Sequence, residues 1–427
     1  MLRKSVIILT SVIIFWMSLS ADDPEDVSSH SEIKRLTYSG NNIARYPCLS
    51  EDGLWMLYVL EIKDGEESVK SIRIMNVENG QERELFRDGE RKAPEPFAET
   101  SLILGTKPPV LSGDGRAAAF ALSLGAPFGI LDHYLAVVNS DGTDFRIIDF
   151  PIEALKEKEP KSLDFRSDQW ERVSAYASSH DGKRIACVMK GYLGPRRYGQ
   201  ASGIVLLDLS TKKQKTLLAP DFIENEWRWL SLPQRPLTGG GWALAISGDG
   251  ERVVFGAQSS QDDTDYDLYV SDWQGTRIIK ITDFKDRWFS QADMSRDGEK
   301  VIFYYTGRQK QGIGTYLVNI DGSGLKHLES RVSPRVEFFD MSGNGRYVLF
   351  KHIYSGMALN LLTGQEVVAF DDKTQGYITG MIPMDFPRFP SFWSPRIMDF
   401  DGNRVLLVGP PQGKEAPEIF LLSLGIK

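Results

Sequence analysis

The sequence contains few of the residues on which many catalytic and metal sites depend. Its 427 residues include only two cysteines and five histidines. It has no Gly-x-Ser-x-Gly nucleophile motif, no His-Glu-x-x-His zinc motif and no Cys-x-x-Cys pair. The sequence therefore gives no support to a serine hydrolase, a zincin or a dithiol oxidoreductase, and we expect no catalytic residues.

Histidine is scarce, so a metal site of three histidines is poorly supplied. The five are His30, His133, His180, His327 and His352. Two of them, His180 and His327, stand in or beside segments that we expect to be tight turns. We therefore expect no cofactor and no resident metal.

An excess of basic charge is also lacking. Lysine and arginine number 50 against 58 acidic residues, giving a formal charge of −8. Loss of Arg3 and Lys4 with a signal peptide would change this charge to −10. Nucleic acid is therefore an unfavourable partner, because its phosphates repel an acidic surface.

A long hydrophobic run occurs only at the N-terminus, where Arg3 and Lys4 precede the apolar segment Val6 to Leu19. Small residues up to Ala21 and an acidic stretch follow. The pattern predicts a signal peptide over residues 1–21 and a flexible acidic leader over 22–32. An uncleaved anchor is the alternative. We expect a periplasmic or secreted protein without stable membrane insertion after cleavage.

What the sequence does contain is a turn of the form Ser-x-Asp-Gly, repeated seven times between short apolar runs. The copies begin at Ser50, Ser112, Ser179, Ser247, Ser295, Ser342 and, in degenerate form, Asp399. Serine and aspartate form local backbone hydrogen bonds, and glycine supplies a positive φ. We assign these turn residues no chemistry.

Each turn lies within a unit of four short strands. In the fifth unit the strands are Ala292–Met294, Lys300–Tyr304, Thr315–Ile320 and Leu325–Leu328. Such units predict an all-β, seven-bladed β-propeller of four-stranded antiparallel blades over residues 33–427. The last unit lacks an outer strand, and Glu32–Tyr38 resembles the outer strands of other units. We expect this N-terminal strand to complete the last blade and close the ring.

The pattern of turn, apolar strand, Tyr-Leu-Val-Asn-Ile-Asp-Gly-Ser-Gly and Leu-x-x-Leu resembles the WD-like repeat of TolB-type β-propellers. The resemblance covers about residues 33–424. It departs from TolB in one respect, because TolB carries an α/β domain before its propeller and only a short segment precedes the first strand here. It therefore implies the propeller and does not imply a Tol-system role. Similar propellers accompany the hydrolase domain of prolyl oligopeptidases, for which the sequence after the seventh unit leaves no room.

Two pairs of residues are candidates for a disulfide and for a site in the central channel. Cys48 and Cys187 fall in non-adjacent blades, so we expect two buried free thiols rather than a disulfide. Asp293 and Asp340 occupy the same register in blades 5 and 6 and could face each other in the central channel. The alternative, which we favour, is that each carboxylate pairs with an arginine or caps backbone of the next blade.

The connections divide into two classes. The turns between first and second strands and between third and fourth strands are all short, and they share one face of the disc, which we call the plain face. The opposite, long-loop face receives the connections between blades and those between second and third strands. The long segments are Arg87–Lys107, Pro151–Arg172, Met189–Gly203, Ala219–Gly241, Gly256–Asp267 and Asp371–Pro395.

Aromatic and basic residues of these segments, together with two at the start of blade 5 on the same face, are the predicted partner-binding site, because such residues dominate interface hot spots. They are Trp227, Trp229, Arg235, Tyr192, Arg196, Arg197, Tyr198, Arg287, Trp288 and Trp393. The alternative is that the loops only pack on one another. The acidic segment Gln261–Asp267 could bind Ca²⁺ weakly, but its spacing favours solvated acidity.

These observations favour an exported, non-enzymatic propeller that binds a protein or peptide of the cell envelope through its long-loop face. The alternative is a propeller enzyme or lectin that acts on polysaccharide at the channel mouth. Carbohydrate thus stays open as a ligand.

Overall fold

A computed structural model describes residues 32–38, 42–64, 67–95, 98–105, 107–124, 132–148, 170–193, 199–217, 243–258, 266–284, 287–307, 312–328, 337–351, 356–370, 397–409 and 418–424. Within these residues the protein consists of strands, turns and bends, and it contains no helix. No segment of this part is a helix long and apolar enough to cross a membrane.

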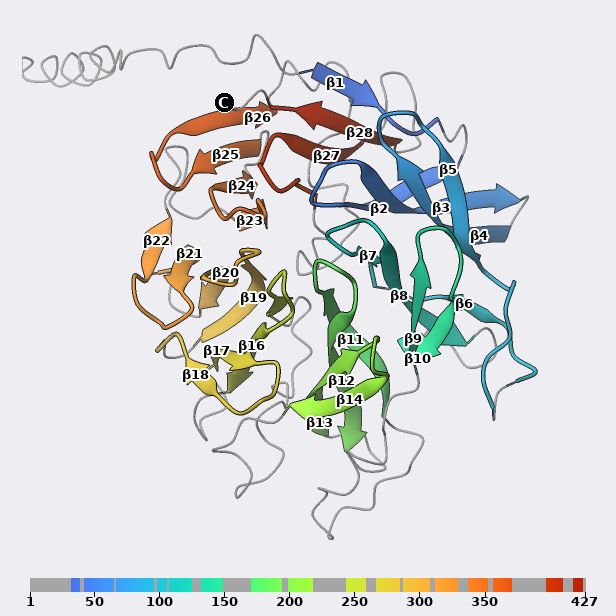
Figure 1. Ribbon diagram of the computed structural model, residues 1–427, viewed down its shortest axis with the longest axis horizontal. Helices are drawn as coiled ribbons and strands as arrows, with labels where there is room; N and C mark the ends of the chain where they lie inside the picture. Colours follow the sequence, from blue (N-terminus) through green and yellow to red (C-terminus); the bar gives the residue numbers. More distant parts are fainter. Residues whose placement is uncertain are drawn as a thin grey trace, which may run out of the picture.

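The strands form seven antiparallel blades arranged in a ring (Figure 1). Blade 1 contains β2 (Ile43–Leu49), β3 (Trp55–Asp64), β4 (Glu67–Asn76) and β5 (Glu82–Arg87). Blade 2 contains β6 (Leu102–Leu104), β7 (Val110–Leu111), β8 (Ala117–Leu124), β9 (Asp132–Asn139) and β10 (Arg146–Ile148), and blade 3 contains β11 (Trp170–Ser178), β12 (Arg184–Leu193), β13 (Gly199–Asp208) and β14 (Lys213–Leu217). Blade 4 contains β15 (Leu244–Ile246), β16 (Arg252–Gln258), β17 (Tyr266–Asp272) and β18 (Ile278–Lys280), and blade 5 contains β19 (Arg287–Met294), β20 (Lys300–Gly307), β21 (Gly314–Asn319) and β22 (Lys326–Leu328). Blade 6 contains β23 (Glu337–Met341), β24 (Tyr347–Lys351), β25 (Gly356–Asn360) and β26 (Glu366–Phe370), and blade 7 contains β27 (Arg404–Gly409), β28 (Glu418–Ser423) and β1 (Glu32–Arg35). The predicted seven-bladed propeller is therefore confirmed.

Blades 2 and 7 modify the four-stranded plan at their inner strand. In blade 2 the inner strand is divided into β6 and β7, which both pair with β8. In blade 7 it is reduced to one bridge, between Met398 and Val405. Strand β6 lies inside Arg87–Lys107, which the sequence suggested to be a loop. Asp88 holds β6 in place, because its carboxylate accepts hydrogen bonds from the amides of Leu104 (2.6 Å) and Lys70 (3.0 Å).

The N-terminal strand closes the ring as predicted. Strand β1 pairs antiparallel with β28, from Glu32 opposite Ser423 to Arg35 opposite Phe420. The fully buried carboxylate of Glu418 joins the two strands, because it accepts hydrogen bonds from Arg35 (2.8 Å) and from the Thr37 hydroxyl (2.6 Å). The strand begins at Glu32, the residue that the sequence assigned to the end of the leader.

Alternate side chains of each strand pack against opposite neighbouring blades. In β3, Leu57 and Val59 belong to the core cluster shared with blade 2, whereas Met56 and Tyr58 belong to the cluster shared with blade 7. This follows from the period of two along a strand, since both faces of a blade are covered. The strands consequently need apolar residues at consecutive positions.

The two cysteines are free and buried, as predicted. Cys48 lies on β2 and Cys187 on β12. Burial raises the pKa of the Cys187 thiol far above its usual value.

Candidate functional site

The repeated turns share one hydrogen-bond pattern. The serine hydroxyl donates to the aspartate or asparagine two residues later, at 2.5–2.9 Å, in all six copies that begin with serine. The same hydroxyl accepts from the amide five residues later. In blade 7 the Asp399 carboxylate accepts a hydrogen bond from the equivalent amide, that of Arg404, at 3.1 Å. The degenerate copy therefore keeps the hydrogen bond that closes the turn. Burial raises the pKa of Asp399.

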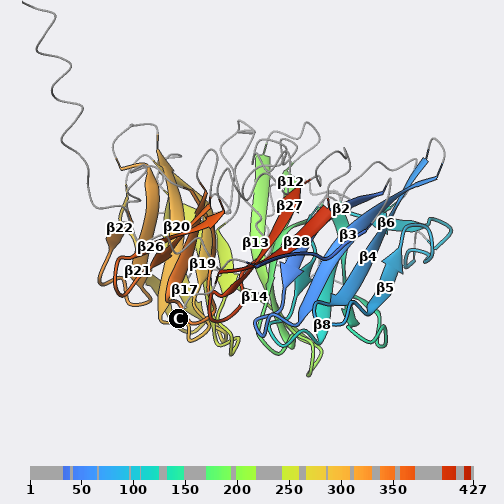
Figure 2. The same ribbon diagram turned by 90° about the horizontal axis from the view of Figure 1, so that it is seen from above.

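The turns also bond to one another around the disc. In each blade an amide of the second or third turn residue donates to the carbonyl of the second turn residue in the next blade. The seven hydrogen bonds measure 2.7–3.0 Å, and the seventh runs from Phe400 back to Glu51. They form a closed ring on the plain face, which appears along the lower edge of the disc in Figure 2. The second turn residues are therefore the innermost part of this face.

Three side chains from blades 1, 3 and 5 meet inside this ring. The Oε2 atom of Glu51 lies 2.8 Å from Nδ1 of His180 and 3.3 Å from a terminal guanidinium nitrogen of Arg296. Because these blades are not neighbours, the side chains can meet only across the centre of the ring. The Glu51 side chain is 2% exposed, and such burial of a carboxylate requires partners of this kind. We call these three residues the axial cluster.

Glycines at the second turn position give the axial cluster its room. A Cβ atom on Gly113 would lie 2.3 Å from Nδ1 of His180 and 2.5 Å from Oε1 of Glu51. A Cβ atom on Gly248 would lie 2.3 Å from Cγ of Arg296. All three distances are too short for real atoms, so the neighbouring large side chains require glycine at both positions. The axial cluster thus places the Glu51 carboxylate between the His180 imidazole and the Arg296 guanidinium at the plain-face end of the central channel.

Sequence reasoning missed the axial cluster because it treated the turn residues as purely local. A usable signal was present, since the variable second position of the turn carries Glu51, His180 and Arg296 in three blades and glycine in three others. Only the closed ring shows that these positions face one another.

Most of the predicted partner-binding residues lie outside the described part of the chain. These are Trp227, Trp229, Arg235, Arg196, Arg197, Tyr198 and Trp393. Of the others, Tyr192 pairs with Gln200 near the end of β12, while Arg287 and Trp288 begin β19 and pair with Gly307 and Thr306. All three backbone positions are at the strand ends opposite the plain-face turns, on the long-loop face.

The two predicted channel carboxylates have similar local geometry. The Oδ1 atoms of Asp293 and Asp340 accept the amide of the next residue, at 2.8 and 2.9 Å. The second oxygen of Asp340 also accepts the amides of Ile397 (2.6 Å) and Met398 (2.8 Å) in blade 7. Asp340 thus caps backbone of the next blade, which is the alternative favoured from the sequence.

Two segments that the sequence assigned to loops continue as paired strands. Within Met189–Gly203, β12 and β13 remain paired as far as Leu193 opposite Gly199. Within Gly256–Asp267, β16 and β17 remain paired as far as Gln258 opposite Tyr266. The sequence did not predict these strand ends, because strand residues that extend beyond the core need not be apolar and therefore lack the apolar pattern of a buried strand.

Metal-binding groups are sparse in the described residues, which contain no cluster of three or more histidine, cysteine, aspartate or glutamate side chains suited to a metal ion. Asp267, the last residue of the predicted acidic segment, is buried on β17. Its carboxylate accepts hydrogen bonds from Thr282 (2.9 Å) and the Phe284 amide (3.0 Å), and it pairs with Lys280 (2.9 Å). Partial burial lowers the pKa of Lys280, but the carboxylates of Asp283 and Asp267 outweigh this effect and raise the pKa overall.

Comparison with solved structures identifies other propellers. An oligogalacturonate lyase in complex with manganese is similar at a TM-score of 0.56 and 12% identity, over 92% of each chain. The β-propeller domain of the trilobed protease from Pyrococcus furiosus is similar at a TM-score of 0.51 and 12% identity, over 89% of this chain and 95% of that one. At such identities the likeness establishes the fold alone.

The TolB family itself is not established by these comparisons. A candidate TolB protein from Agrobacterium tumefaciens is 16% identical and covers 69% of this chain and 86% of its own, at a TM-score of 0.36. No protein-family model and no curated protein matches the sequence.

Proposed function

We propose that this TolB-like propeller is an exported, non-enzymatic scaffold that binds a protein or peptide of the cell envelope through its long-loop face. The observation that carries the proposal is the contrast between the two faces. On the plain face the channel end is filled by the axial cluster, and the short turns are bonded into a ring.

The long-loop face is built in the opposite way. The hairpins of β3 with β4 and of β12 with β13 consist of ten-residue strands, whereas β24 and β25 have five residues each. Strands of this length extend beyond the core toward the long-loop face. A rigid scaffold that supports long connections on one face is the usual arrangement for binding.

Capture of envelope proteins tests this proposal. The tagged protein would be used to isolate partners from its native envelope, and the partners would be identified by mass spectrometry. We expect Trp227→Ala together with Trp229→Ala to lower capture of the specific partner at least tenfold, the loss typical of hot-spot residues (about 2 kcal/mol). The matched control is Leu362→Ala, which removes an exposed apolar side chain (68% exposed) from the plain face. Equal capture by both variants would refute the choice of residues.

A propeller enzyme or lectin that acts on polysaccharide is the second candidate, and the fold similarity to an oligogalacturonate lyase is its support. Incubation with oligogalacturonate, with and without manganese, distinguishes the two candidates when products are followed by mass spectrometry. The scaffold proposal expects no cleavage under either condition.

A further inference from the structure

A groove of about 980 Å³ opens on the plain face between blades 1 and 2. Its walls are the short turns of the two blades, and its apolar base includes Trp55 and Ile74. Trp55 is only partly buried, although it packs against the core cluster that the two blades share. The groove is therefore a preformed surface with an aromatic side chain at its base, and it lies away from the long-loop face.

The corresponding space at three other blade interfaces is filled by an arginine of the protein itself. The residue five positions after the first turn residue is Arg184 in blade 3, Arg252 in blade 4 and Arg404 in blade 7. Each guanidinium reaches the next blade: Arg184 contacts Glu251 at 2.5 Å, Arg252 contacts Glu299 at 2.7 Å, and Arg404 donates to the Gly53 carbonyl at 2.9 Å.

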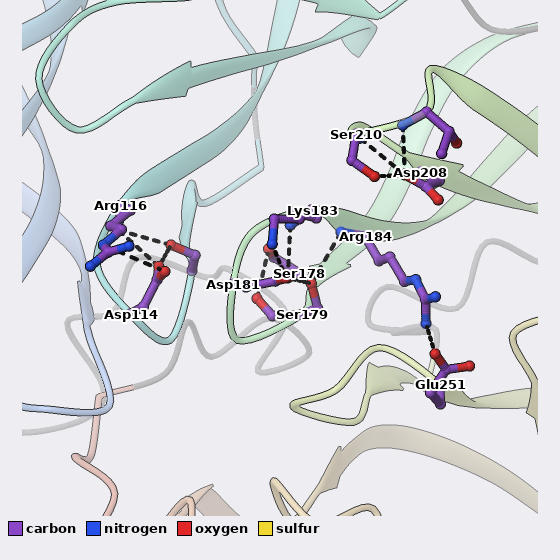
Figure 3. A network of polar contacts seen from close by, with 12 residues as sticks. Asp114, Arg116, Ser178, Ser179, Asp181, Lys183, Arg184, Asp208, Ser210 and Glu251 are labelled. Carbon is purple, nitrogen blue, oxygen red and sulfur yellow. Dashed lines mark hydrogen bonds and ion pairs between the residues drawn. The ribbon is translucent and has the colours of Figure 1, made fainter.

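At the interface of blades 3 and 4 the arginine also lies over an aromatic ring. The guanidinium of Arg184 is 5.1 Å from the ring centroid of Trp273. It also pairs with Glu251, as Figure 3 shows. A cation held between a tryptophan face and a carboxylate is a favourable arrangement. In blade 1 the position of Arg184 is taken by Trp55, whose ring lies against the turn glycine of the next blade: a Cβ atom on Gly115 would lie 2.7 Å from Cδ1 of Trp55, just as one on Gly250 would lie 2.7 Å from Cδ of Arg184. This interface therefore has a tryptophan ring where the three others have a guanidinium group.

The charges that remain around the groove favour a cation. Its lining contains four carboxylates (Asp52, Glu82, Asp114 and Asp141) against two guanidinium groups (Arg83 and Arg116). Glu82 also pairs with Arg73 at 3.1 Å, so the formal charge that remains is −1.

Both lining arginines already have contacts. Arg83 donates to the Ser140 carbonyl across the groove at 3.5 Å, and Arg116 pairs with Asp114 at 3.9 Å. The Arg116 side chain is 86% exposed, so it leaves the groove open. In Asp141 the Oδ1 atom accepts the hydrogen bonds from Thr143 within the turn, and the carboxylate is exposed to solvent.

We propose that this groove binds an arginine side chain of a partner polypeptide, with its guanidinium stacked on Trp55 and paired with the carboxylates of Asp114 and Asp141. The ligand would repeat the kind of contact that Arg184 makes, in which a guanidinium group lies over a tryptophan ring and pairs with a carboxylate. The site is separate from the long-loop face, so its failure leaves the scaffold proposal untouched.

The test uses the full chain labelled with 5-fluorotryptophan and the blocked peptide acetyl-Gly-Arg-Gly-amide. The Trp55 resonance is identified by its loss in Trp55→Phe. We expect a saturable shift of this resonance with the arginine peptide, and binding at least roughly tenfold weaker for the same peptide with citrulline, its neutral isostere.

A matched pair of variants locates the carboxylate. Asp141 and Asp321 occupy the same position in the equivalent turns of blades 2 and 5, and each Oδ1 atom accepts bonds from the Thr or Ser two residues later. Only Asp141 borders the groove. We expect Asp141→Asn to weaken binding of the arginine peptide roughly tenfold and Asp321→Asn to change it less than about twofold.

A third variant, Trp55→Arg, introduces the residue type of blades 3, 4 and 7. It should abolish binding of the arginine peptide, measured by calorimetry because the Trp55 resonance is lost, since it removes the ring and places a competing cation beside the carboxylates. Equal binding of the citrulline peptide, or equal effects of the two aspartate variants, would overturn the proposal. So would a Trp55 shift produced by the neutral disaccharide cellobiose and not by the arginine peptide, because that result assigns the groove to carbohydrate.

Discussion

At the scale of single residues, the second position of each turn determines what stands on the channel axis. Glu51, His180 and Arg296 come from three separate blades, and each depends on a glycine in an adjacent blade for its space. A turn residue that looks local in the sequence is therefore a tertiary contact in the ring.

Gly113→Ala tests the axial cluster directly. The new Cβ atom would lie 2.3 Å from His180 and 2.5 Å from Glu51, so the cluster must separate. We expect the free energy of unfolding to fall by about 1–3 kcal/mol in urea denaturation. The matched control is Gly256→Ala, whose Cβ atom would meet Ala243 at an ordinary 3.5 Å and should leave stability unchanged or slightly raised. Equal losses from the two variants would show that the axial cluster does not constrain Gly113.

The sequence predicted the ring but not this cluster, and the reason is physical. Serine, aspartate and glycine report the backbone conformation of a turn, and seven such turns suffice to predict seven blades. The identity of Glu51, His180 and Arg296 acquires meaning only when distant blades are brought to a common axis, and no local propensity encodes that contact.

At the scale of elements, the strand that closes the ring depends on one buried ion pair. Glu418 on β28 is fully buried and is held by Arg35 and Thr37 of the N-terminal segment. Lys34 adds a link to blade 1, because its ammonium group donates to the carbonyl of Val77 at 2.7 Å. Strand β1 is thus held within blade 7 by Glu418 and links this blade to blade 1 through Lys34.

Arg35→Met leaves the Glu418 carboxylate buried without its cation. We expect this variant to lose about 2–4 kcal/mol of stability, since removing one partner leaves a buried charge whose desolvation is no longer compensated. Hydrogen exchange of the β28 amides bonded to β1 should accelerate at the same time. Arg87→Met is the control, because Arg87 pairs with Glu84 at the surface and should cost less than about 1 kcal/mol. A similar small loss from Arg35→Met would contradict the role of the pair in closure.

The hairpins show why sequence reasoning shortened the strands at the long-loop face. Within the blade core both faces of a strand are buried, so the sequence there shows the short apolar runs from which the strands were predicted. Beyond the core, Tyr192 and Gln200 still pair, but neither position needs to be apolar. Polar strand ends therefore resemble loops in the sequence.

At the scale of the whole molecule, every blade shares a buried cluster with each of its two neighbours, so the core runs around the ring without a break. Cys48 in blade 1 and Cys187 in blade 3 are natural reporters of this continuity, because both are buried (1% and 0% exposed). Burial also raises the pKa of Cys187, so little thiolate forms in the native state.

We expect both thiols to resist alkylation at pH 9 in the native protein. In increasing urea they should become reactive at the same midpoint, since opening blade 3 alone would expose the clusters that it shares with blades 2 and 4. Peptide-level mass spectrometry measures the two sites separately. A lower midpoint for Cys187 than for Cys48 would show instead that the blades unfold independently.

The size of the residue at the second turn position also alternates around the ring. Around the axis the second turn residues run Glu51, Gly113, His180, Gly248, Arg296, Gly343 and Phe400, so bulky and minimal side chains alternate. An odd number of blades cannot alternate without one mismatch, and the mismatch falls between Phe400 and Glu51, at the seam where the chain closes. Phe400 is the one bulky member left out of the ion-paired group, and its ring instead lies 5.3 Å from the Arg296 guanidinium. In a propeller with an even number of blades, large residues and glycine could alternate all the way around the ring, and no two large residues would be neighbours.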